Sequence, residues 1–318
     1  MRHALPQLSR LFVTDAGLET DLIFNRGIDL PCFSSITLLR TDEGRRVLDD
    51  YFRSYLELAR RLGTGCLLES ASWRASPDWA PNLGLEVGEL EALNRSSVEM
   101  LKTLREEYRS DRTPVVVSGC IGPRGDGYDP GAIMSPEQAE DYHSWQAFAL
   151  ASAGPDLLSA ITMTNVNEAL GITRAARRAG LPVVIAFTVE TDGRLPTGDS
   201  LRSAVEAVDE ATGAYPAYYM VNCAHPTHFM ALLKPAEDWT KRLGGLRANA
   251  SRCSHAELDA MTELDSGDPD ELGRLYREIR RTLPHVNVLG GCCGTDLRHV
   301  TAIAEACALE EDALPSAA

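Results

Sequence analysis

Eight short apolar segments recur along the chain, and each is followed by a stretch with helical periodicity. Many of them are rich in β-branched residues, as expected of strands buried on both faces. Alternating strands and helices predict a parallel sheet with right-handed crossovers. Eight repeats predict closure into an α/β fold of the (β/α)8 TIM-barrel type, and an open doubly wound sheet is the alternative. The segments are Leu11–Thr14, Cys66–Leu68, Pro114–Ser118, Asp156–Ile161, Pro182–Thr188, Ala217–Val221, Gly244–Arg247 and Val286–Leu289.

The helical stretches carry recognisable boundaries. The first has apolar residues at three- and four-residue spacing from Leu48 to Leu62, and Gly63 is placed to end it. Ser135 followed by Pro136 indicates an N-cap and a proline in the first turn. Further helices are predicted near 88–109, 137–153, 167–179, 200–212, 270–283 and 296–308, and the stretch 225–242 is the least clear. With 318 residues and no linker, residues 1–318 are expected to form a single barrel domain.

Charge and hydropathy restrict the partners and the compartment. The formal net charge is −15, so nucleic acid and anionic membranes are poor partners, whereas a cationic small molecule would be favoured. No apolar run is long enough to span a membrane, and the first residues lack the apolar stretch of a secretory signal. We therefore expect a cytoplasmic protein, in which closely spaced cysteines indicate metal binding or catalysis more often than disulfides.

Polar, glycine and cysteine residues follow the ends of the predicted strands. In a parallel barrel the C-terminal strand ends form one rim, which carries the chemistry. Asp15, Glu69, Glu190 and Asn249 follow four of the strands, Asn222-Cys223 follows the sixth, and Gly290-Gly291-Cys292-Cys293-Gly294-Thr295 follows the eighth. We expect these residues to converge on one site.

Three of the eight cysteines could hold one metal ion. Cys292 and Cys293 are adjacent, and the flanking Gly290, Gly291 and Gly294 permit unusual backbone angles at that turn. Cys223 ends a strand two positions away around the barrel. Three thiolates with one open position describe a catalytic Zn²⁺ site, whereas a closed structural site would need a fourth ligand, such as His225 or His228. Three unrelated core cysteines are the remaining interpretation.

An open zinc site with thiolate ligands suits alkyl transfer to a thiol. Zinc lowers the pKa of a bound thiol, and the thiolate is the nucleophile required for displacement at a methyl carbon. Zinc-activated water would instead support hydrolysis, with Glu69 or Glu190 as general base. A non-enzymatic alternative is a redox- or zinc-sensing protein that uses Cys292 and Cys293.

At these positions the chain resembles the homocysteine S-methyltransferase family, whose members use betaine, S-methylmethionine or S-adenosylmethionine. The resemblance implies the (β/α)8 barrel, zinc on Cys223, Cys292 and Cys293, and homocysteine sulfur at the open position. The product would be methionine, and the partners a small-molecule thiol acceptor and a cationic methyl donor. It rests on segments that run through the chain in order: Thr14–Thr20, Ser118–Pro123, Phe187–Glu190 with Gly193–Leu195, Val221–Cys223 and Gly290–Thr295.

Individual roles follow from the resemblance. Asp15 matches an aspartate near the amino acid substrate, although capping of its own loop is the alternative. Asn222 is expected to shape the turn before Cys223 or to support that ligand. Catalytic roles are predicted for Asp15 from the resemblance, and for Glu69 and Glu190 from their positions at the ends of strands. Substrate contacts are predicted for Asp15, Trp73, Thr162 and Asn222.

One position departs from the family pattern. After the fourth strand, family members carry a Glu-Thr pair whose glutamate binds the homocysteine amino group, but this chain has Ile161-Thr162. An apolar side chain cannot pair with an ammonium ion. Glu69 or Glu190 could supply the carboxylate, the acceptor could be a thiol without that amino group, or the activity could have been lost while the metal is kept.

The donor is less well defined than the acceptor. Trp73 and Trp79 follow the second strand, where a cation could rest on an indole face, or the rings could simply pack the loop. The chain lacks the long C-terminal extension of betaine-using members, which favours a sulfonium donor. The sequence leaves a homodimer open, since the outer faces of barrels look alike in monomers and dimers.

Overall fold

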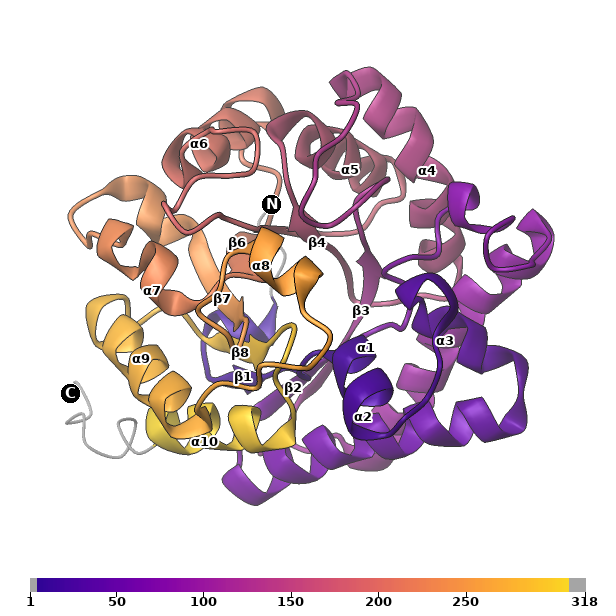
Figure 1. Cartoon of the computed structure of the whole chain (residues 1–318), viewed down its shortest axis with the longest axis horizontal. Helices are drawn as coiled ribbons and strands as arrows, with labels where there is room; N and C mark the ends of the chain where they lie inside the picture. The colour runs from indigo at the N-terminus through magenta and orange to yellow at the C-terminus, as the bar shows by residue number, and fades with distance from the viewer. Residues whose placement is uncertain (1–4, 309–318) are drawn as a thin grey trace.

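The computed structural model describes residues 5–308, in which eight parallel strands close into a barrel in sequence order (Figure 1). Closure occurs at β1, where Phe12 lies opposite Gly65 of β2 on one side and Val288 of β8 on the other. The predicted TIM barrel is confirmed, and the open sheet is excluded. The strands are β1 (Phe12–Val13), β2 (Gly65–Glu69), β3 (Val115–Ile121), β4 (Leu157–Met163), β5 (Val183–Phe187), β6 (Tyr218–Asn222), β7 (Leu243–Ala248) and β8 (Val288–Gly291).

Helices surround the barrel, and those predicted from periodicity are present within a residue or two, except that the first begins earlier. Thr41 caps the first long helix, and Gly63 ends it in the left-handed region at φ 69°. Ser135 forms the expected cap before Pro136. The helices are α1 (Leu18–Thr20), α2 (Asp42–Leu62), α3 (Val87–Tyr108), α4 (Pro136–Ser152), α5 (Val166–Arg178), α6 (Leu201–Thr212), α7 (Pro226–Phe229), α8 (His255–Ala260), α9 (Pro269–Thr282) and α10 (Leu297–Ala308).

The core has two parts because successive side chains of a strand point to opposite faces. On β2, Leu67 points into the barrel, where it joins Phe12, Val116 and Val288. Cys66 and Leu68 point outward into the larger core between sheet and helices. Glu69 shares the face of Leu67, which places a carboxylate on the inward side of the barrel wall.

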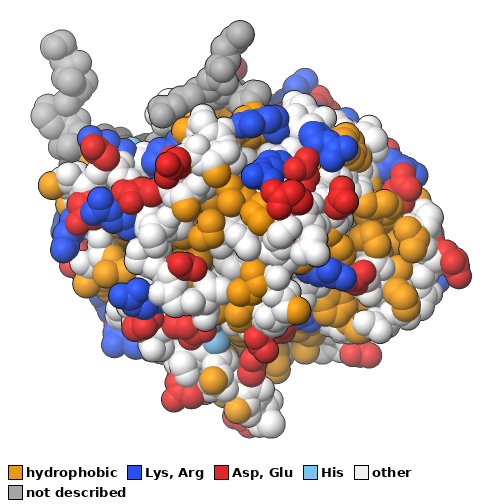
Figure 2. All heavy atoms as spheres, turned by 90° about the horizontal axis from the view of Figure 1, so that it is seen from above, with side chains coloured by type: hydrophobic (Ala, Val, Ile, Leu, Met, Phe, Trp, Pro, Cys, Tyr) orange, Lys and Arg blue, Asp and Glu red, His pale blue; other side chains and the backbone are white. Residues whose placement is uncertain are grey.

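The segment between β6 and β7 has no clear helical periodicity in its sequence, because it contains no long helix. It contains the four-residue α7 and two short 3-10 turns, Met230–Leu232 and Asp238–Arg242, in place of one long helix. Across residues 5–308, none of the helices is both long and apolar enough to cross a membrane. Acidic and basic side chains are interspersed on the face shown in Figure 2.

Candidate functional site

A cavity of about 300 Å3 lies at the C-terminal ends of the strands. This volume is at the lower end of the range of small-molecule sites. Its wall contains residues at or just beyond the ends of β1, β2, β3, β4, β6, β7 and β8, as expected of a site on the predicted rim. They include Asp15, Glu69, Cys120, Ile161, Thr162, Cys223, Arg247, Cys292 and Cys293, and the loops add Glu19, Trp73, Arg74, Asp126, Tyr128 and Asp259.

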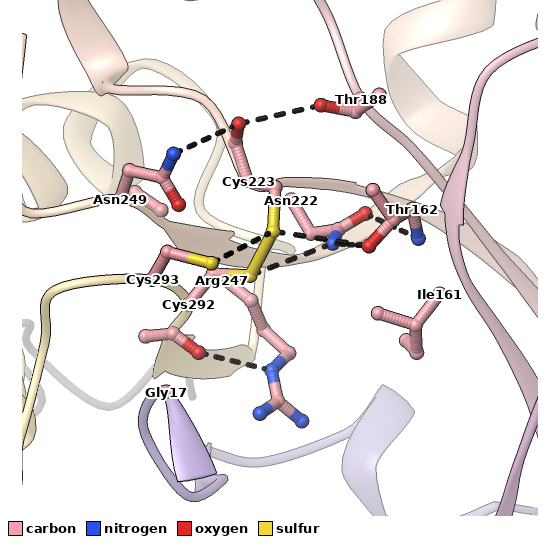
Figure 3. Close-up of a disulfide and its surroundings, with 12 residues drawn as sticks. Gly17, Ile161, Thr162, Thr188, Asn222, Cys223, Arg247, Asn249, Cys292 and Cys293 are labelled. Carbon is pink, nitrogen blue, oxygen red and sulfur yellow. Dashed lines mark hydrogen bonds between the residues drawn. A yellow bond between two sulfur atoms is a disulfide. The ribbon is translucent and has the colours of Figure 1, made fainter. Parts of the chain in front are cut away.

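The sulfur atoms of Cys223, Cys292 and Cys293 meet at one point of this wall (Figure 3). All three lie within 4.8 Å of one another. Cys223 and Cys292 form a disulfide, and Cys293 lies 4.0 Å from Cys223 as a free thiol. The structure thus brings together the three cysteines that the sequence predicted as ligands. A metal could use all three only after the disulfide is reduced.

Glycines around the cysteine pair are required for two different reasons. Gly294 adopts φ 78°, the left-handed conformation that the turn was expected to need. Gly290 and Gly291 instead lie in β8, where a Cβ atom would stand 1.9 Å from Thr14 Oγ1 and 2.0 Å from Thr295 Oγ1, respectively. Close packing of neighbouring chain segments, rather than an unusual backbone angle, therefore explains these two glycines.

Hydrogen bonds fix the backbone that carries Cys223, whose own φ is 50°. Its carbonyl accepts from Asn249 Nδ2 at 3.1 Å, from Thr188 Oγ1 at 3.3 Å and from His255 Nε2 at 2.7 Å. Two of these bonds are visible in Figure 3. A residue held in this uncommon conformation needs such support from its surroundings.

Asn222 connects β6 to β4 beside the sulfur atoms. Its Oδ1 accepts from the Thr162 backbone N–H at 2.9 Å, and its Nδ2 donates to Thr162 Oγ1 at 2.8 Å. Nδ2 also lies 3.8 Å from Cys292 Sγ, while Thr162 Oγ1 lies 3.8 Å from Cys223 Sγ. Asn222 and Thr162 are therefore neighbours of the sulfur cluster, and Thr162 is held at φ 67°.

Charged side chains are buried at the floor of the cavity. Asp15 forms an ion pair of 2.8 Å with Arg247, and Arg247 also donates to the carbonyls of Gly291 and Ala16, at 3.2 Å each. Burial raises the pKa of Asp15, and the Arg247 guanidinium opposes that shift. Burial likewise raises the pKa of Glu69, with a smaller opposing effect from Arg247.

Ile161 does line the cavity, and the residue is only 6% exposed. Trp73 lies beside it and donates from Nε1 to the Ile161 carbonyl at 3.1 Å. The Arg74 guanidinium lies 5.0 Å from the Trp73 ring centroid and 4.7 Å from that of Trp79. The Arg74 guanidinium therefore already occupies the faces of these indoles, where the sequence analysis placed a cationic methyl donor.

Two predicted site residues, Asn222 and Glu190, do not line the cavity: Asn222 still lies beside Cys292 Sγ, whereas Glu190 lies farther out. It pairs at 2.9 Å with His255 Nδ1, and its side chain is 35% exposed. His255 in turn stacks on Tyr128, with ring centroids 3.9 Å apart, and the Tyr128 hydroxyl donates to Cys293 Sγ at 3.4 Å. Glu190 is therefore connected to the cysteines through His255 and Tyr128 and does not line the cavity itself.

The two histidines considered as a fourth ligand have other partners. His225 Nδ1 bonds to Thr227 Oγ1 at 2.8 Å, and His228 Nε2 bonds to the Arg252 carbonyl at 2.9 Å. Among residues 5–308, the group of side chains that could hold a metal contains the three cysteines and no histidine. This arrangement matches an open site rather than a closed structural one.

Three residues of the site escaped the sequence analysis. Arg247 had a signal, since a charged residue at the end of an otherwise apolar strand has to be paired when it is buried. Tyr128 stands in a glycine-rich loop and His255 begins a short helix, and neither shows a pattern that points to the cysteines.

Comparison with known proteins identifies the family. Residues 12–307 match the family model of homocysteine S-methyltransferase. Homocysteine S-methyltransferase 1 of Arabidopsis thaliana is 24% identical, with 92% of this chain and 91% of the relative aligned. Homocysteine S-methyltransferase of Escherichia coli (strain K12) is 30% identical over 64% of this chain and 66% of its own. Selenocysteine Se-methyltransferase of Brassica oleracea var. italica is 24% identical over 95% and 90%.

Solved structures show the same fold. The metallated form of the homocysteine methyltransferase MmuM from Escherichia coli superposes with a TM-score of 0.68 at 22% identity, covering 93% of this chain and 96% of that one. Its oxidized form gives 0.67 at 23% identity, covering 92% and 94%. The family expected from the sequence is confirmed by the family model, which spans nearly all of the described residues. The chain therefore belongs to the homocysteine S-methyltransferase family and is an S-methyltransferase.

Proposed function

We propose that this S-methyltransferase transfers a methyl group from a small cationic donor to the sulfur of homocysteine, giving methionine, with zinc held by Cys223, Cys292 and Cys293. The observation that carries the proposal is the convergence of three cysteine sulfurs, within 4.8 Å of one another, on the wall of a cavity of small-molecule size. The relatives named for homocysteine support the choice of acceptor.

The donor set fits zinc. Tetrahedral zinc with Zn–S bonds of about 2.3 Å separates its sulfur ligands by roughly 3.8 Å. The 4.0 Å between Cys223 Sγ and Cys293 Sγ is close to that value. Reduction of the Cys223–Cys292 bond frees both of its sulfur atoms to act as ligands beside Cys293, and a reducing compartment such as the cytosol would keep them as thiols. When bound, zinc would lower the pKa of the acceptor thiol, so that its sulfur is a thiolate at neutral pH.

The side chains around the sulfurs would orient the ligands. Asn222 Nδ2, Thr162 Oγ1 and Tyr128 Oη each lie within hydrogen-bonding distance of a different cysteine sulfur, at 3.4 to 3.8 Å. Donors of this kind stabilise thiolates and hold them in place. The chain thus provides an outer shell for every ligand, which three unrelated core cysteines would not require.

The charge of the cavity favours a cationic donor. Five carboxylates line it, against the two guanidinium groups of Arg74 and Arg247, and the carboxylates are Asp15, Glu19, Glu69, Asp126 and Asp259. With a sulfonium donor, the thiolate attacks the methyl carbon while the bond from that carbon to the donor sulfur breaks. The electron pair of the broken bond stays on the donor, which leaves as a neutral thioether, so no proton has to be supplied. Positioning of the two partners then provides much of the acceleration.

Zinc content and methyl transfer test this function together. Protein purified under reducing conditions should contain about one zinc per chain, with three sulfur ligands by X-ray absorption and a fourth after homocysteine is added. Cys292→Ala should lose both zinc and turnover. Cys253→Ala is the matched control, since Cys253 is a free thiol outside the cavity wall, and it should keep both.

Three results would redirect the proposal. Active, reduced protein without zinc, or full activity in Cys292→Ala, would overturn the metal mechanism. Hydrolysis that needs no thiol would indicate a zinc hydrolase. Reversible zinc release on oxidation, with no turnover of any donor, would indicate a redox-sensing protein.

A further inference from the structure

Glu69 is a buried carboxylate on the wall of the cavity. The residue is only 5% exposed, and neither carboxylate oxygen has a hydrogen-bond partner among residues 5–308. The hydroxyls of Ser118 and Ser159 lie close enough to oppose the effect of burial on the pKa of Glu69, but they bond to each other at 2.7 Å. Burying such a group without a partner is costly, so a partner supplied by a ligand is expected.

Arg247 does not fill this role, because its contacts are directed elsewhere. Its guanidinium pairs with Asp15 and donates to the carbonyls of Ala16 and Gly291. The Asp15–Arg247 pair is thus neutral as a unit. When it is ionised, Glu69 adds one negative charge to the floor of the cavity, and no ion pair among residues 5–308 balances that charge.

The other candidate carboxylates are already occupied or lie elsewhere. Glu190 pairs with His255 and does not line the cavity. Glu19 lines the cavity but accepts a hydrogen bond of 2.7 Å from Ser35 Oγ. Asp126 and Asp259 also line the cavity, but both are exposed to solvent. Among the buried carboxylates of the cavity, Glu69 is therefore the one whose two oxygens remain available to a cationic group.

Glu69 lies on β2, and one strand, β3, separates it from β4, on which the family places its glutamate. Glu69 of β2 is paired with Ser118 of β3, and Ser118 is bonded to Ser159 of β4. Ile161 follows Ser159 by two residues, so the side chains of both face the barrel interior. The same cavity reaches Glu69, Ile161 and the three cysteines.

We propose that Glu69 is the specificity residue of the acceptor site: it binds the ammonium group of an α-amino thiol, in place of the family's glutamate at the position of Ile161. The acceptor class is then a thiol that carries a protonated amine, such as homocysteine, rather than a thiol without one. This inference rests on the proposed function, because the acceptor sulfur has to lie at the three cysteines. On this assignment, the carboxylate that this chain lacks on β4 is supplied by β2 instead.

Binding of two matched thiols to the reduced, zinc-loaded protein tests this assignment without methyl transfer. The ligands are homocysteine and 4-mercaptobutanoate, which differ by the amino group alone, and calorimetry gives the dissociation constant of each. Wild-type protein should prefer homocysteine, and Glu69→Gln should lose roughly 100-fold of that preference, since truncating one partner of a buried charge pair has an effect of this size. Binding of 4-mercaptobutanoate should not weaken in this variant.

Further variants separate recognition from folding. Glu69→Gln/Ile161→Glu returns a carboxylate to β4 and should regain the preference for homocysteine, which a misfolded protein would not. Glu206→Gln, at an exposed glutamate that pairs with Arg202 far from these residues in the sequence, is the matched control and should keep the wild-type preference. Glu19→Gln tests the other glutamate of the cavity wall, and the preference should survive in it as well.

Equal affinity of the wild-type protein for both thiols would overturn the assignment of Glu69. An unchanged preference in Glu69→Gln, or loss of the preference in Glu19→Gln instead, would also overturn it. Failure of the proposed function is distinguishable, because it would appear as absent methyl transfer to either thiol while the binding preference is still measured.

Discussion

Removal of Arg247 should be among the most damaging single changes away from the apolar core. Arg247 is 6% exposed and joins three strands: it lies on β7, donates to the Gly291 carbonyl of β8, and contacts Asp15 and Ala16 just after β1. Arg247→Met keeps much of the apolar stem but leaves the Asp15 carboxylate buried without its cation.

The magnitude follows from these contacts. Breaking a buried ion pair by removing one partner costs about 3 to 5 kcal/mol. Two carbonyls that lose their donor add roughly 1 kcal/mol each. We expect Arg247→Met to lower the free energy of unfolding by about 5 kcal/mol or more, a large part of the stability of a typical domain.

Urea denaturation of reduced, metal-free protein, followed by circular dichroism, measures this loss. Asp15→Asn/Arg247→Met should lose about 1 to 3 kcal/mol less than the sum of the two single variants, because the pair is removed as a unit. Arg202→Met is the control: Arg202 also pairs with a carboxylate, Glu206 at 2.9 Å, but is 57% exposed, and its removal should cost less than about 1 kcal/mol. A loss below about 1 kcal/mol in Arg247→Met, or strict additivity in the double variant, would refute the reasoning.

Three further predictions concern backbone packing, oxidation and pH. Gly290→Ala should destabilise the protein strongly in thermal unfolding, because its Cβ would lie 1.9 Å from Thr14 Oγ1. Gly88→Ala, whose Cβ would meet nothing within 4 Å, is the control and should be neutral or stabilising. Equal melting temperatures of the two variants would contradict this prediction. Oxidised protein with the Cys223–Cys292 bond should bind no zinc and should regain it after thiol reduction, as measured by metal content, and full zinc in the oxidised protein would argue against the ligand set. Burial raises the pKa of Glu69, so ligand-free protein should lose stability as the pH rises from the ordinary glutamate pKa through that raised value. Glu69→Gln should remove this loss and should be more stable than wild type at pH 7 by on the order of 1 to 3 kcal/mol. Identical profiles of stability against pH for the two proteins would exclude this prediction.

The sequence alone determined the architecture and the metal-ligand candidates. Eight apolar segments alternate with amphipathic stretches, and only a parallel sheet with helical crossovers accommodates that order. Parallel strands end on one rim, so Cys223 and the Cys292–Cys293 pair could be brought together from their positions after strands, although 69 residues separate Cys223 from Cys292. The exchange of the family's glutamate for Ile161 was equally visible in the sequence.

Only the tertiary structure decided which charged groups serve the cavity. Glu69 and Glu190 are indistinguishable as carboxylates at strand ends, yet Glu69 ends β2 with its side chain inward, whereas Glu190 lies three residues beyond β5. Strand alternation fixes the direction of the first, but a turn fixes that of the second, in which the Glu190 N–H donates to the Arg194 carbonyl. The pairing of Arg247 with Asp15, and the approach of Tyr128 to Cys293, join residues more than 150 positions apart. Such contacts depend on how strands and loops stack in space, which no local pattern encodes.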